Sequence, residues 1–502
     1  MPGGTDHMSA STPLIVTFAA YLLLMVGLGF AAWKRTRTFD DYILGGRSLG
    51  SYVTALAAGA SDMSGWLMMG LPGALYLGGA SEAWIAIGLV IGAWCNWKYV
   101  AGPLRVYTER TRNALTLPDY FTHRFEDHSK LLRILSALVI LVFFAIYCAS
   151  GIVAGARLFE SVFGLPYGQA MLWGAAVTIA YTFIGGFLAV SWTDTVQATL
   201  MIFALLLVPI MVMVGVGGPI PALELIEQVD PARLQWVGAG GVVAIVSAMA
   251  WGLGYFGQPH ILARFMAADS LATIPRARRI GMTWMILCLA GAMLTGFFGI
   301  AWFAANPNLA GPVDANPERV FIVLSELLFN PWIAGVLLSA ILAAIMSTLS
   351  AQLLVCSSAL TEDFYRGFVR PKAGHGELVW FGRAMVLLVA VLAIWIARDP
   401  DSRVLGLVAY AWAGFGAAFG PVVLLSLFWR RMTRNGALVG MLAGAVTVLL
   451  WKHTGSALYE MVPGFIAATV AIVVISLLGK APSPALQAQH EQVRLTLREN
   501  GY

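Results

Sequence analysis

Charged residues are scarce in this chain of 502 residues, at 11% for Asp, Glu, Lys and Arg together. A soluble protein carries about 25% charged residues. Because 59% of the residues are hydrophobic, too few polar side chains remain to cover a water-facing surface, so lipid must cover much of it. The net charge of +5 does not indicate nucleic-acid binding, because the charges fall in short clusters between apolar runs.

Cysteine is also rare, and the four cysteines lie in or beside apolar segments without C-x-x-C spacing. This pattern favours neither a disulfide framework nor a zinc site. We expect all four to be packing residues. They are Cys95, Cys148, Cys288 and Cys356.

Long polar segments are missing as well. The longest loops expected on the outer side of the membrane, 216–237 and 306–330, are rich in Pro and Gly and too short for a domain. The polar tail 481–502 is too short for a kinase or another signalling module, and we expect a solvated end. The first apolar run, 14–33, is as long as a membrane span and has no basic stretch before it, so we expect no cleaved signal peptide.

The chain does contain many apolar runs of bilayer length, since a hydrocarbon core of about 30 Å needs roughly 20 residues of helix. They predict an all-α membrane protein with thirteen spans. The predicted spans are 13–33, 50–77, 83–104, 131–158, 166–186, 190–215, 238–263, 278–305, 331–362, 377–397, 403–429, 434–452 and 457–479.

The basic residues alternate with these spans. If the N-terminus is outside, the loops that start at residues 34, 98, 264, 366, 430 and 480 face the cytoplasm, and they hold 25 of the 31 Lys and Arg residues. Cytoplasmic loops carry such an excess of positive charge. The distribution therefore predicts thirteen spans, with the N-terminus outside and the C-terminus inside.

The second predicted span has an unusual centre at residues 59–70. Asp62 lies at membrane depth, where a carboxylate is costly and is a functional candidate by default. Gly59, Gly65 and nearby hydroxyls make local unwinding easy, and unwound backbone at this depth must line a protein cavity. Its carbonyls could bind a hard cation such as sodium. The alternative is a kinked helix in which Asp62 is hydrogen-bonded to a neighbour.

A second break interrupts the seventh predicted span at residues 251–259, which contain three glycines and Pro259. Both breaks fall in the first helix of a five-span block, and odd span counts make the two blocks run in opposite senses. Paired broken helices in inverted halves indicate a substrate site near the bilayer midplane. The expected division is 1–49 (leader, first accessory span and loop), 50–215 (first repeat), 216–237 (outer loop), 238–429 (second repeat), 430–480 (two accessory spans) and 481–502 (tail).

A third polar stretch lies in the ninth predicted span. Ala344, Ser347 and Thr348 share one helix face by their i, i+3 and i+4 spacing. Their two hydroxyls and a freed carbonyl could complete a sodium shell. The alternative is that small residues let two helices pack closely.

Other polar residues carry weaker signals. Asp194 could line a cation path or cap the helix that follows, and Arg47 could be an inner-gate residue or an ordinary cytoplasmic charge. We expect His260 to be structural, because no partner for a metal lies at ligand spacing. No basic residue is expected near either break to bind a strong anion, so a carboxylate would have to sit on exposed N–H groups at the start of a half-helix.

Six stretches of the sequence resemble the sodium:solute symporter family, and the likeness extends from about residue 10 to residue 480. Such long matches are far more specific than a short motif. They are 39–47, 59–66, 146–151, 185–195, 251–264 and 339–350.

The resemblance implies a five-plus-five inverted-repeat fold with three accessory spans in a bacterial inner membrane. It also implies inward cotransport of one sodium ion with one L-proline, without an obligate protein partner. By the family's pattern, the sodium ligands are the backbone of Ala60, Met63 and Ala344 and the side chains of Ser347 and Thr348. The implied proline pocket is formed by Ser64, Trp66, Tyr147, Trp251, Tyr255 and Pro259. The resemblance gives Asp62 and Asp194 roles in sodium coupling, and Arg47 a role in gating.

Other functions stay open at this stage. The cotransported solute could be a sugar, pantothenate or a carboxylate instead of proline. A membrane receptor for proline and a passive channel are further alternatives, although no output module follows residue 480. An enzyme is not expected, because the sequence shows no set of nucleophile, base and orienting residue and no metal cluster.

Overall fold

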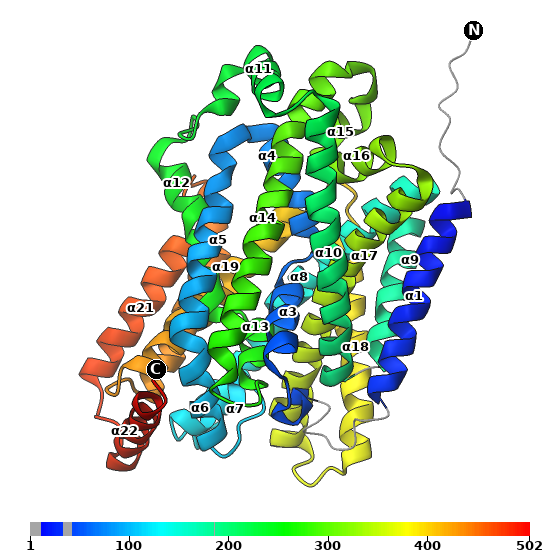
Figure 1. Ribbon diagram of the computed structural model, residues 1–502. Coiled ribbons are helices and arrows are strands. Elements are labelled where there is room, and N and C mark those ends of the chain that lie inside the picture. The colour runs from blue at the N-terminus through cyan, green and yellow to red at the C-terminus, as the bar shows by residue number, and fades with distance from the viewer. Residues whose placement is uncertain (1–11, 34–42, 185, 502) are drawn as a thin grey trace.

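The computed structural model describes residues 12–33, 43–184 and 186–501. Every regular element in these segments is a helix, and their β-type pairing is limited to an isolated bridge between Leu49 and Ala268. The prediction of an all-α protein is therefore confirmed (Figure 1). Two of the stretches that carry the family resemblance, 39–47 and 185–195, lie partly outside the described residues.

The helices follow one another with short connections. They are α1 (Thr12–Trp33), α3 (Ser51–Asp62), α4 (Leu71–Gly78), α5 (Ala83–Cys95), α6 (Ala101–Arg110), α7 (Leu117–Arg124), α8 (Leu131–Phe163), α9 (Tyr167–Ile184), α10 (Phe187–Gly215), α11 (Pro219–Val229), α12 (Gly241–Met249), α13 (Pro259–Met266), α14 (Thr273–Ala305), α15 (Gly311–Ala315), α16 (Val320–Leu328), α17 (Pro331–Ser358), α18 (His375–Ala397), α19 (Val404–Phe428), α20 (Arg434–Trp451), α21 (Met461–Leu478) and α22 (Pro484–Glu499). Short 3-10 or π-helical segments adjoin them at η1 (Gly45–Arg47), η2 (Trp66–Gly70), η3 (Gly79–Glu82), η4 (Asn96–Val100), η6 (Ala250–Gly257), η8 (Pro317–Arg319) and η9 (Ala359–Val369).

Ten helices among the described residues are long and apolar enough to cross a membrane, and a bent pair formed by Gly241–Gly257 and Pro259–Met266 is an eleventh. One of the ten, Trp66–Arg110, has 45 residues, more than twice the length that spans a bilayer. It turns at Gly79, whose φ is +72°, and so contains α4 and α5 as separate helices. These eleven do not include α9, and they count α4 together with α5 as one span. Counting α9 and the α3–α4 unit as separate spans would give thirteen, and that number stays a prediction.

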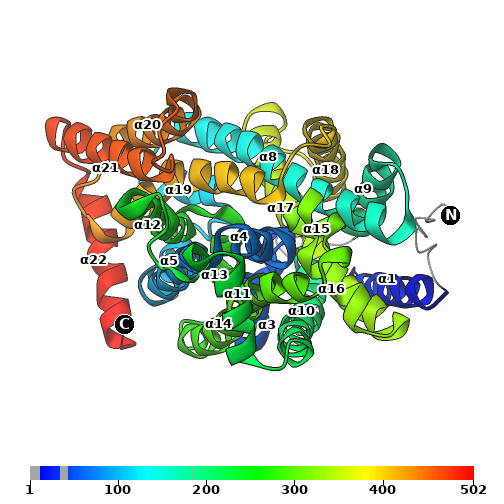
Figure 2. The ribbon, with the colours of Figure 1, turned by 90° about the horizontal axis from the view of Figure 1, so that it is seen from above.

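The interior of the bundle is formed by three long helices. The apolar windows of α17, α19 and α8 are 89%, 83% and 78% buried, whereas those of α1 and α21 are only 28% buried. Figure 2 shows α1 on one side of the bundle and α20, α21 and α22 on the other. The predicted accessory spans at the two ends of the chain therefore lie at the periphery.

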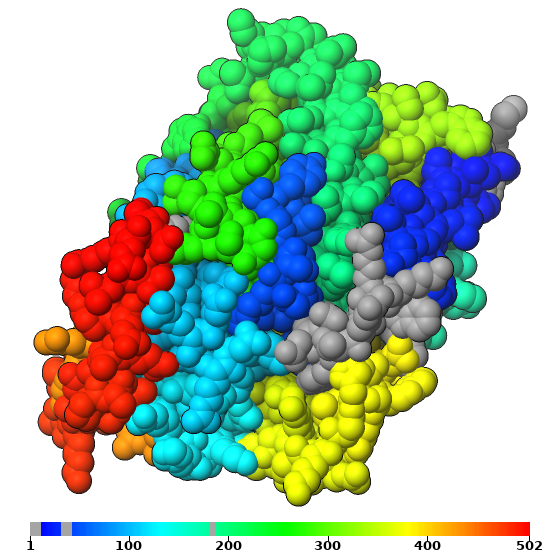
Figure 3. Space-filling model, turned by 60° about the horizontal axis from the view of Figure 1, so that its bottom comes forward, coloured from blue at the N-terminus to red at the C-terminus, as the bar shows by residue number. Residues whose placement is uncertain are grey.

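The described chain starts and ends at opposite ends of the bundle. In Figure 1, α1 starts at the upper end, whereas α22 lies at the lower end beside α6 and α7. Figure 3 shows this lower face, with α22 in red against the cyan segment that contains α6 and α7. We call this face the α22 end and the opposite face the outer end.

Both predicted helix breaks are present, although the first is narrower than expected. α3 continues as regular helix through Gly59 to Asp62, and the backbone leaves the helix only at residues 63–64. The expectation that Gly59 helps to unwind the helix is wrong. A Cβ at Gly59 would lie 2.6 Å from the ring of Trp284, so this glycine is needed for close packing.

Glycines also bring α5 into backbone contact with η6, the broken part of the seventh predicted span. A Cβ at Gly92 would lie 2.1 Å from the carbonyl oxygen of Gly252, and a Cβ at Gly252 would lie 2.2 Å from that of Gly88. Small residues at helix interfaces in membranes allow such approach. These glycines therefore hold the second break against the first repeat.

Gly252→Ala is expected to lower the free energy of unfolding by about 1–3 kcal/mol, because the added methyl group overpacks a backbone contact. The measurement is the thermal unfolding midpoint of the purified protein in detergent. Gly27→Ala is the matched control, since nothing lies within 4 Å of a Cβ at that position of α1. Equal midpoints for the two variants would contradict the packing argument.

Candidate functional site

The break after α3 frees a backbone carbonyl at membrane depth. In a continuous helix the amide of Ser64 would donate to Ala60, but here it donates to the carbonyl of Asp62 at 2.9 Å. Met63, with φ −77° and ψ +79°, turns the chain out of the helix. The carbonyl oxygen of Ala60 is thus released from the helix ladder.

Two hydroxyl groups of α17 reach this carbonyl. Ser347 Oγ donates to the Ala60 oxygen at 2.8 Å, and Thr348 Oγ1 donates to the same atom at 3.1 Å. Ser347 Oγ also lies 3.1 Å from the carbonyl oxygen of Ala344. The structure therefore brings together four of the five predicted sodium ligands, while Met63 lies buried three residues further along the break. Carbonyl and hydroxyl oxygens are ligands that suit a hard cation such as sodium.

The carboxylate of Asp62 connects the two broken helices. Tyr255 OH, from η6, donates to Asp62 Oδ2 at 2.5 Å. The other oxygen, Oδ1, is buried and has no hydrogen-bond partner among the described residues. A buried carboxylate oxygen without a partner is costly, so this atom is suited to bind a cation or a donor from a ligand. The hydrogen bond from Tyr255 is the neighbour contact that the alternative of a kinked helix expects, but it leaves Oδ1 of Asp62 without a partner among the described residues.

Aromatic side chains from several helices surround the break. Trp66 Nε1 donates to the carbonyl oxygen of Asp62 at 2.9 Å, and Tyr147 OH of α8 lies 3.5 Å from the same atom. The ring centroids of Trp66 and Trp251 lie 6.4 Å apart, so the indole rings of the two broken segments are neighbours. This wall of rings with polar edges suits a small solute that has an apolar body.

Two further aromatic residues hold Trp251, and sequence reasoning missed both. The ring of Tyr459 stacks on that of Trp251 at 5.7 Å, and Trp412 Nε1 of α19 donates to the Trp251 carbonyl at 2.7 Å. Tyr459 lies at the start of the predicted accessory span 457–479, so no local pattern relates it to the core. A single sequence carries no signal for such a distant pair.

Ser64 and Pro259 lie at the edges of this arrangement. Ser64 is buried in the break, and its Oγ lies 3.4 Å from the amide of Trp66. Pro259 begins α13, and the next residue, His260, places its ring 5.9 Å from the ring of Tyr147. Pro259 also lines a small cavity of about 20 Å³ on the side toward the α22 end.

His260 is structural in the sense that it packs among rings, but it is not hydrogen-bonded. Neither ring nitrogen has a hydrogen-bond partner in the part of the chain that the structure describes. No group of three or more His, Cys, Asp or Glu residues suited to a metal ion occurs there either.

A cavity of about 530 Å³ leads from the outer end toward the break. Trp251 lines it together with Gly70 and Gly73 on the first broken helix. Glu318 and Arg403, from outer loops, lie at its rim. The aromatic site is therefore approached from the outer end.

Glu318 stabilises one wall of this cavity by capping α19. Its two carboxylate oxygens accept hydrogen bonds from the amides of Val404 and Leu405, each at 3.0 Å. Burial raises the pKa of the Glu318 carboxyl group, although the two amides oppose this shift. A carboxylate at a helix N-terminus is favourable, so the start of α19 is held in place.

The α22 end is closed by a network around Arg47. Its guanidinium donates to Asn113 Oδ1 at 2.8 Å, to Thr108 Oγ1 at 3.2 Å and to the carbonyl oxygens of Ala114 and Met266 at 2.9 and 2.5 Å. An ordinary cytoplasmic charge would be solvated. Arg47 instead ties η1 to the α6–α7 connection and to the end of α13.

The chain beside Arg47 adds a second closure. The amide of Leu49 donates to Ala267 at 3.2 Å, and the amide of Asp269 donates back to Leu49 at 3.0 Å. Arg105 Nε donates to the carbonyl oxygen of Ala268 at 2.5 Å. The molecule is therefore closed at the α22 end and has a cavity at the opposite end.

Asp194 lies away from the first break and forms an ion pair. Its Oδ2 lies 3.2 Å from Arg264 NH2, and both side chains are fully buried. α10 starts at Phe187, with Gly186 as its N-cap, which rules out Asp194 as a cap. Arg264 lies in α13, so a basic residue does follow the second break. Its charge is balanced by Asp194, so it does not provide a free anion site.

The comparisons with known proteins agree with this geometry. The sodium:solute symporter family pattern matches residues 42–444. The chain is 69% identical over 481 residues to the sodium/proline symporter of Salmonella typhimurium, covering 96% of both chains, and 68% identical over 481 residues to that of Escherichia coli, also covering 96% of both. Its fold is similar to that of a Na+-coupled sialic acid symporter solved in a substrate-bound outward-open state, with a TM-score of 0.80, 18% identity and coverage of 95% of this chain and 100% of that one.

The sequence match covers most of the chain, and the fold similarity extends over nearly all of it. A buried set of hard oxygen ligands beside two broken helices is the arrangement that sodium-coupled solute transport requires. From its sequence, fold and site, the chain belongs to the sodium:solute symporter family.

Proposed function

We propose that this protein carries L-proline into the cell together with sodium by alternating access. The observation that carries the proposal is the convergence of Ser347 and Thr348 on the freed carbonyl of Ala60, next to a chamber of aromatic rings. The relatives that share 69% and 68% of their residues with this chain are sodium/proline symporters, which supports proline as the solute.

Sodium would be held by the carbonyl oxygens of Ala60, Met63 and Ala344 and by the hydroxyls of Ser347 and Thr348. The two hydroxyls now donate to Ala60, and bound sodium would turn them to present lone pairs instead. The ion would then link α3 to α17 directly. If bound sodium orders the site and raises its affinity for proline, bound proline must raise the affinity for sodium by the same factor.

Proline would sit on the outer side of this ion, between the two breaks. Its ring would pack on Trp66 and Trp251, and its carboxylate would replace the partners that the amides of Ser64 and Trp66 now have at the break. Tyr147 and Tyr255 would supply polar edges. The remaining member of the proposed pocket, at the start of α13, is Pro259.

Three further residues would support the cycle. Asp62 would place a negative charge near the ion and sense its arrival through Tyr255. Asp194, paired with Arg264, would assist sodium coupling from the interior of α10. Arg47 would act as a gate at the α22 end through its hydrogen bonds to neighbouring segments.

The topology is part of the proposal. We infer a bacterial inner-membrane protein with the outer end in the periplasm and the α22 end in the cytoplasm, because most basic residues belong to loops of the α22 end. Residues 50–215 and 238–429 would be the inverted repeats, joined by the outer loop 216–237. Residues 1–49 and 430–480 would contribute the accessory spans, and 481–502 the cytoplasmic tail.

Uptake of labelled L-proline into proteoliposomes tests the proposal directly. We expect saturable uptake in an inward sodium gradient and its loss when choline replaces sodium. A panel of unlabelled solutes then defines the substrate, and proline should compete more strongly than sugars, pantothenate or simple carboxylates. Uptake that persists unchanged in choline would refute sodium coupling.

Ser347→Ala is expected to raise the sodium concentration for half-maximal uptake by about tenfold, which corresponds to the loss of one ligand worth about 1.4 kcal/mol. Ser350→Ala is the matched control, because Ser350 lies on the same helix, is equally buried and donates to the carbonyl of Ser347 at 3.1 Å. Sodium titration of uptake measures both. A similar sodium requirement in the two variants would remove Ser347 from the site.

A further inference from the structure

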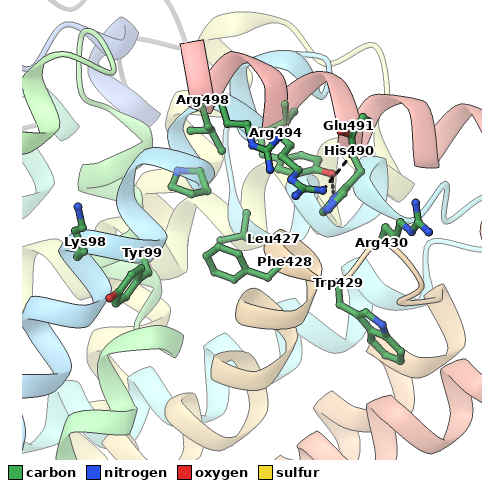
Figure 4. A pocket seen from close by; sticks show the side chains of 14 residues that line it. Lys98, Tyr99, Leu427, Phe428, Trp429, Arg430, His490, Glu491, Arg494 and Arg498 are labelled. Carbon is green, nitrogen blue, oxygen red and sulfur yellow. Dashed lines mark hydrogen bonds and ion pairs between the residues drawn. The ribbon is translucent and has the colours of Figure 1, made fainter. Parts of the chain in front are cut away.

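A pocket of about 600 Å³ lies at the α22 end, apart from the transport site. One side is formed by α22, and the others by η4, α6 and the end of α19, as Figure 4 shows. None of the residues assigned to sodium or proline lines it. Its lining therefore calls for a separate explanation.

Positive charge dominates this pocket. Lys98, Arg430, Arg494 and Arg498 line it, and the lining carries a single carboxylate, that of Glu491. The Arg494–Glu491 pair is 3.8 Å apart with both side chains about half exposed, so it neutralises little. In the described part of the chain, no carboxylate lies within ion-pair distance of Lys98, Arg430 or Arg498.

His490 fixes α22 in position at the back of the pocket. Its Nδ1 and Tyr107 OH of α6 share a hydrogen bond of 2.7 Å. Burial, aided by the nearby Arg124, lowers the pKa of His490 to about 4, so the ring is neutral at pH 7. His490 therefore adds no positive charge at the base of the pocket at pH 7.

The pocket opens onto an apolar surface. Tyr99 and Phe428 line it and are 48% and 54% exposed, and Trp429 lies beside them. Trp94, one turn before Tyr99, is also largely exposed. Exposed aromatic side chains at the end of membrane helices sit at the level of lipid headgroups. The charged pocket is therefore continuous with a surface that faces lipid.

The orientation of α22 fits this location. It appears nearly end-on in Figure 1 and lengthwise in Figure 2, so it lies across the spans. Leu486, His490 and Val493 are buried on one face, whereas Arg494 and Arg498 are exposed. α22 therefore packs its buried face on α6 and leaves Arg494 and Arg498 accessible.

We propose that this pocket binds the headgroup of an anionic phospholipid from the leaflet that borders the α22 end. The guanidinium groups of Arg494 and Arg498 would bind the phosphate, and the acyl chains would run along Tyr99 and Phe428. Basic pockets beside membrane helices recognise anionic headgroups in this way. A soluble phosphate would match the cations but would leave the apolar part of the surface unused.

Native mass spectrometry of the full-length protein tests this after reconstitution into phosphatidylcholine vesicles with or without phosphatidylglycerol. We expect the wild type to retain phosphatidylglycerol in preference to phosphatidylcholine through detergent exchange. Arg494→Gln with Arg498→Gln should reduce that retention by tenfold or more, because each cation near an anionic lipid contributes about fivefold. Arg276→Gln with Arg279→Gln is the matched control, since it removes two exposed charges from the start of α14.

Arg430→Gln separates lipid binding from a loss of α22 structure, because Arg430 follows α19 and leaves α22 unchanged. It should reduce retention by about fivefold. Equal retention in the pocket and control variants would overturn the proposal, as would equal retention of the two lipids by the wild type. Competition by inorganic phosphate at millimolar concentration would also overturn it, in favour of a soluble anion.

Discussion

Asp62→Asn is expected to raise the sodium concentration for half-maximal proline uptake by about 100-fold. The substitution keeps an oxygen that can accept from Tyr255 but removes a buried negative charge two residues from the Ala60 carbonyl. A unit charge a few Å from a cation in a partly screened interior contributes about 2–4 kcal/mol, and 100-fold corresponds to about 2.7 kcal/mol. Sodium titration of uptake in proteoliposomes gives the number, and the order of solute preference should be unchanged.

Tyr255→Phe is the companion variant. It removes the hydrogen bond to Asp62 but leaves the charge, so the sodium requirement should rise by about tenfold or less. An Asp62→Asn protein whose sodium requirement stays within threefold of the wild type would show that this carboxylate does not act on the ion.

Arg264→Ala and Asp194→Ala are each expected to destabilise the folded protein by about 3–5 kcal/mol, because each leaves one uncompensated charge in the interior. Replacing both by apolar residues, as Asp194→Leu with Arg264→Met, should recover most of the folded yield. Thermal unfolding and monodisperse yield after purification measure this double-mutant cycle.

The pair of Arg370 and Glu377, 3.4 Å apart with side chains 62% and 34% exposed, is the matched control for this cycle. Alanine at either position should change stability by less than about 1 kcal/mol. Single substitutions at Asp194 or Arg264 that match these control effects would contradict the buried pair. A double variant that folds and transports with normal sodium dependence would exclude Asp194 from coupling.

Local chemistry made the first helix break readable from sequence. An aspartate beside glycines and hydroxyls in an apolar run is expensive unless it has a function, and the structure places the break at residues 63–64 within that stretch. The i, i+3, i+4 face of α17 was also readable, because helical periodicity needs no distant information. That Ser347 and Thr348 both reach the carbonyl of Ala60 required the tertiary structure.

The residues that the sequence alone places wrongly or leaves out have contact partners that are distant in sequence. Arg264 was grouped with cytoplasmic loop charges, although it lies fully buried against Asp194. Gly59 was read as a source of flexibility, whereas the Trp284 ring requires the absence of a side chain there. Tyr459 lies more than 200 residues from the Trp251 ring on which it stacks. Composition and periodicity describe each helix alone and do not show which one it packs against.

The Arg47 network has a consequence for how tightly the two fluxes are coupled. At least four hydrogen bonds at the α22 end must break before that end opens, a combined cost of about 2–6 kcal/mol. At the lower value, the empty protein opens inward only a few per cent of the time. If Arg47 gates this end as proposed, idle cycles that dissipate the ion gradient without moving solute would be rare, and their frequency would depend on the hydrogen bonds of Arg47, Leu49 and Arg105, far from the proposed solute site.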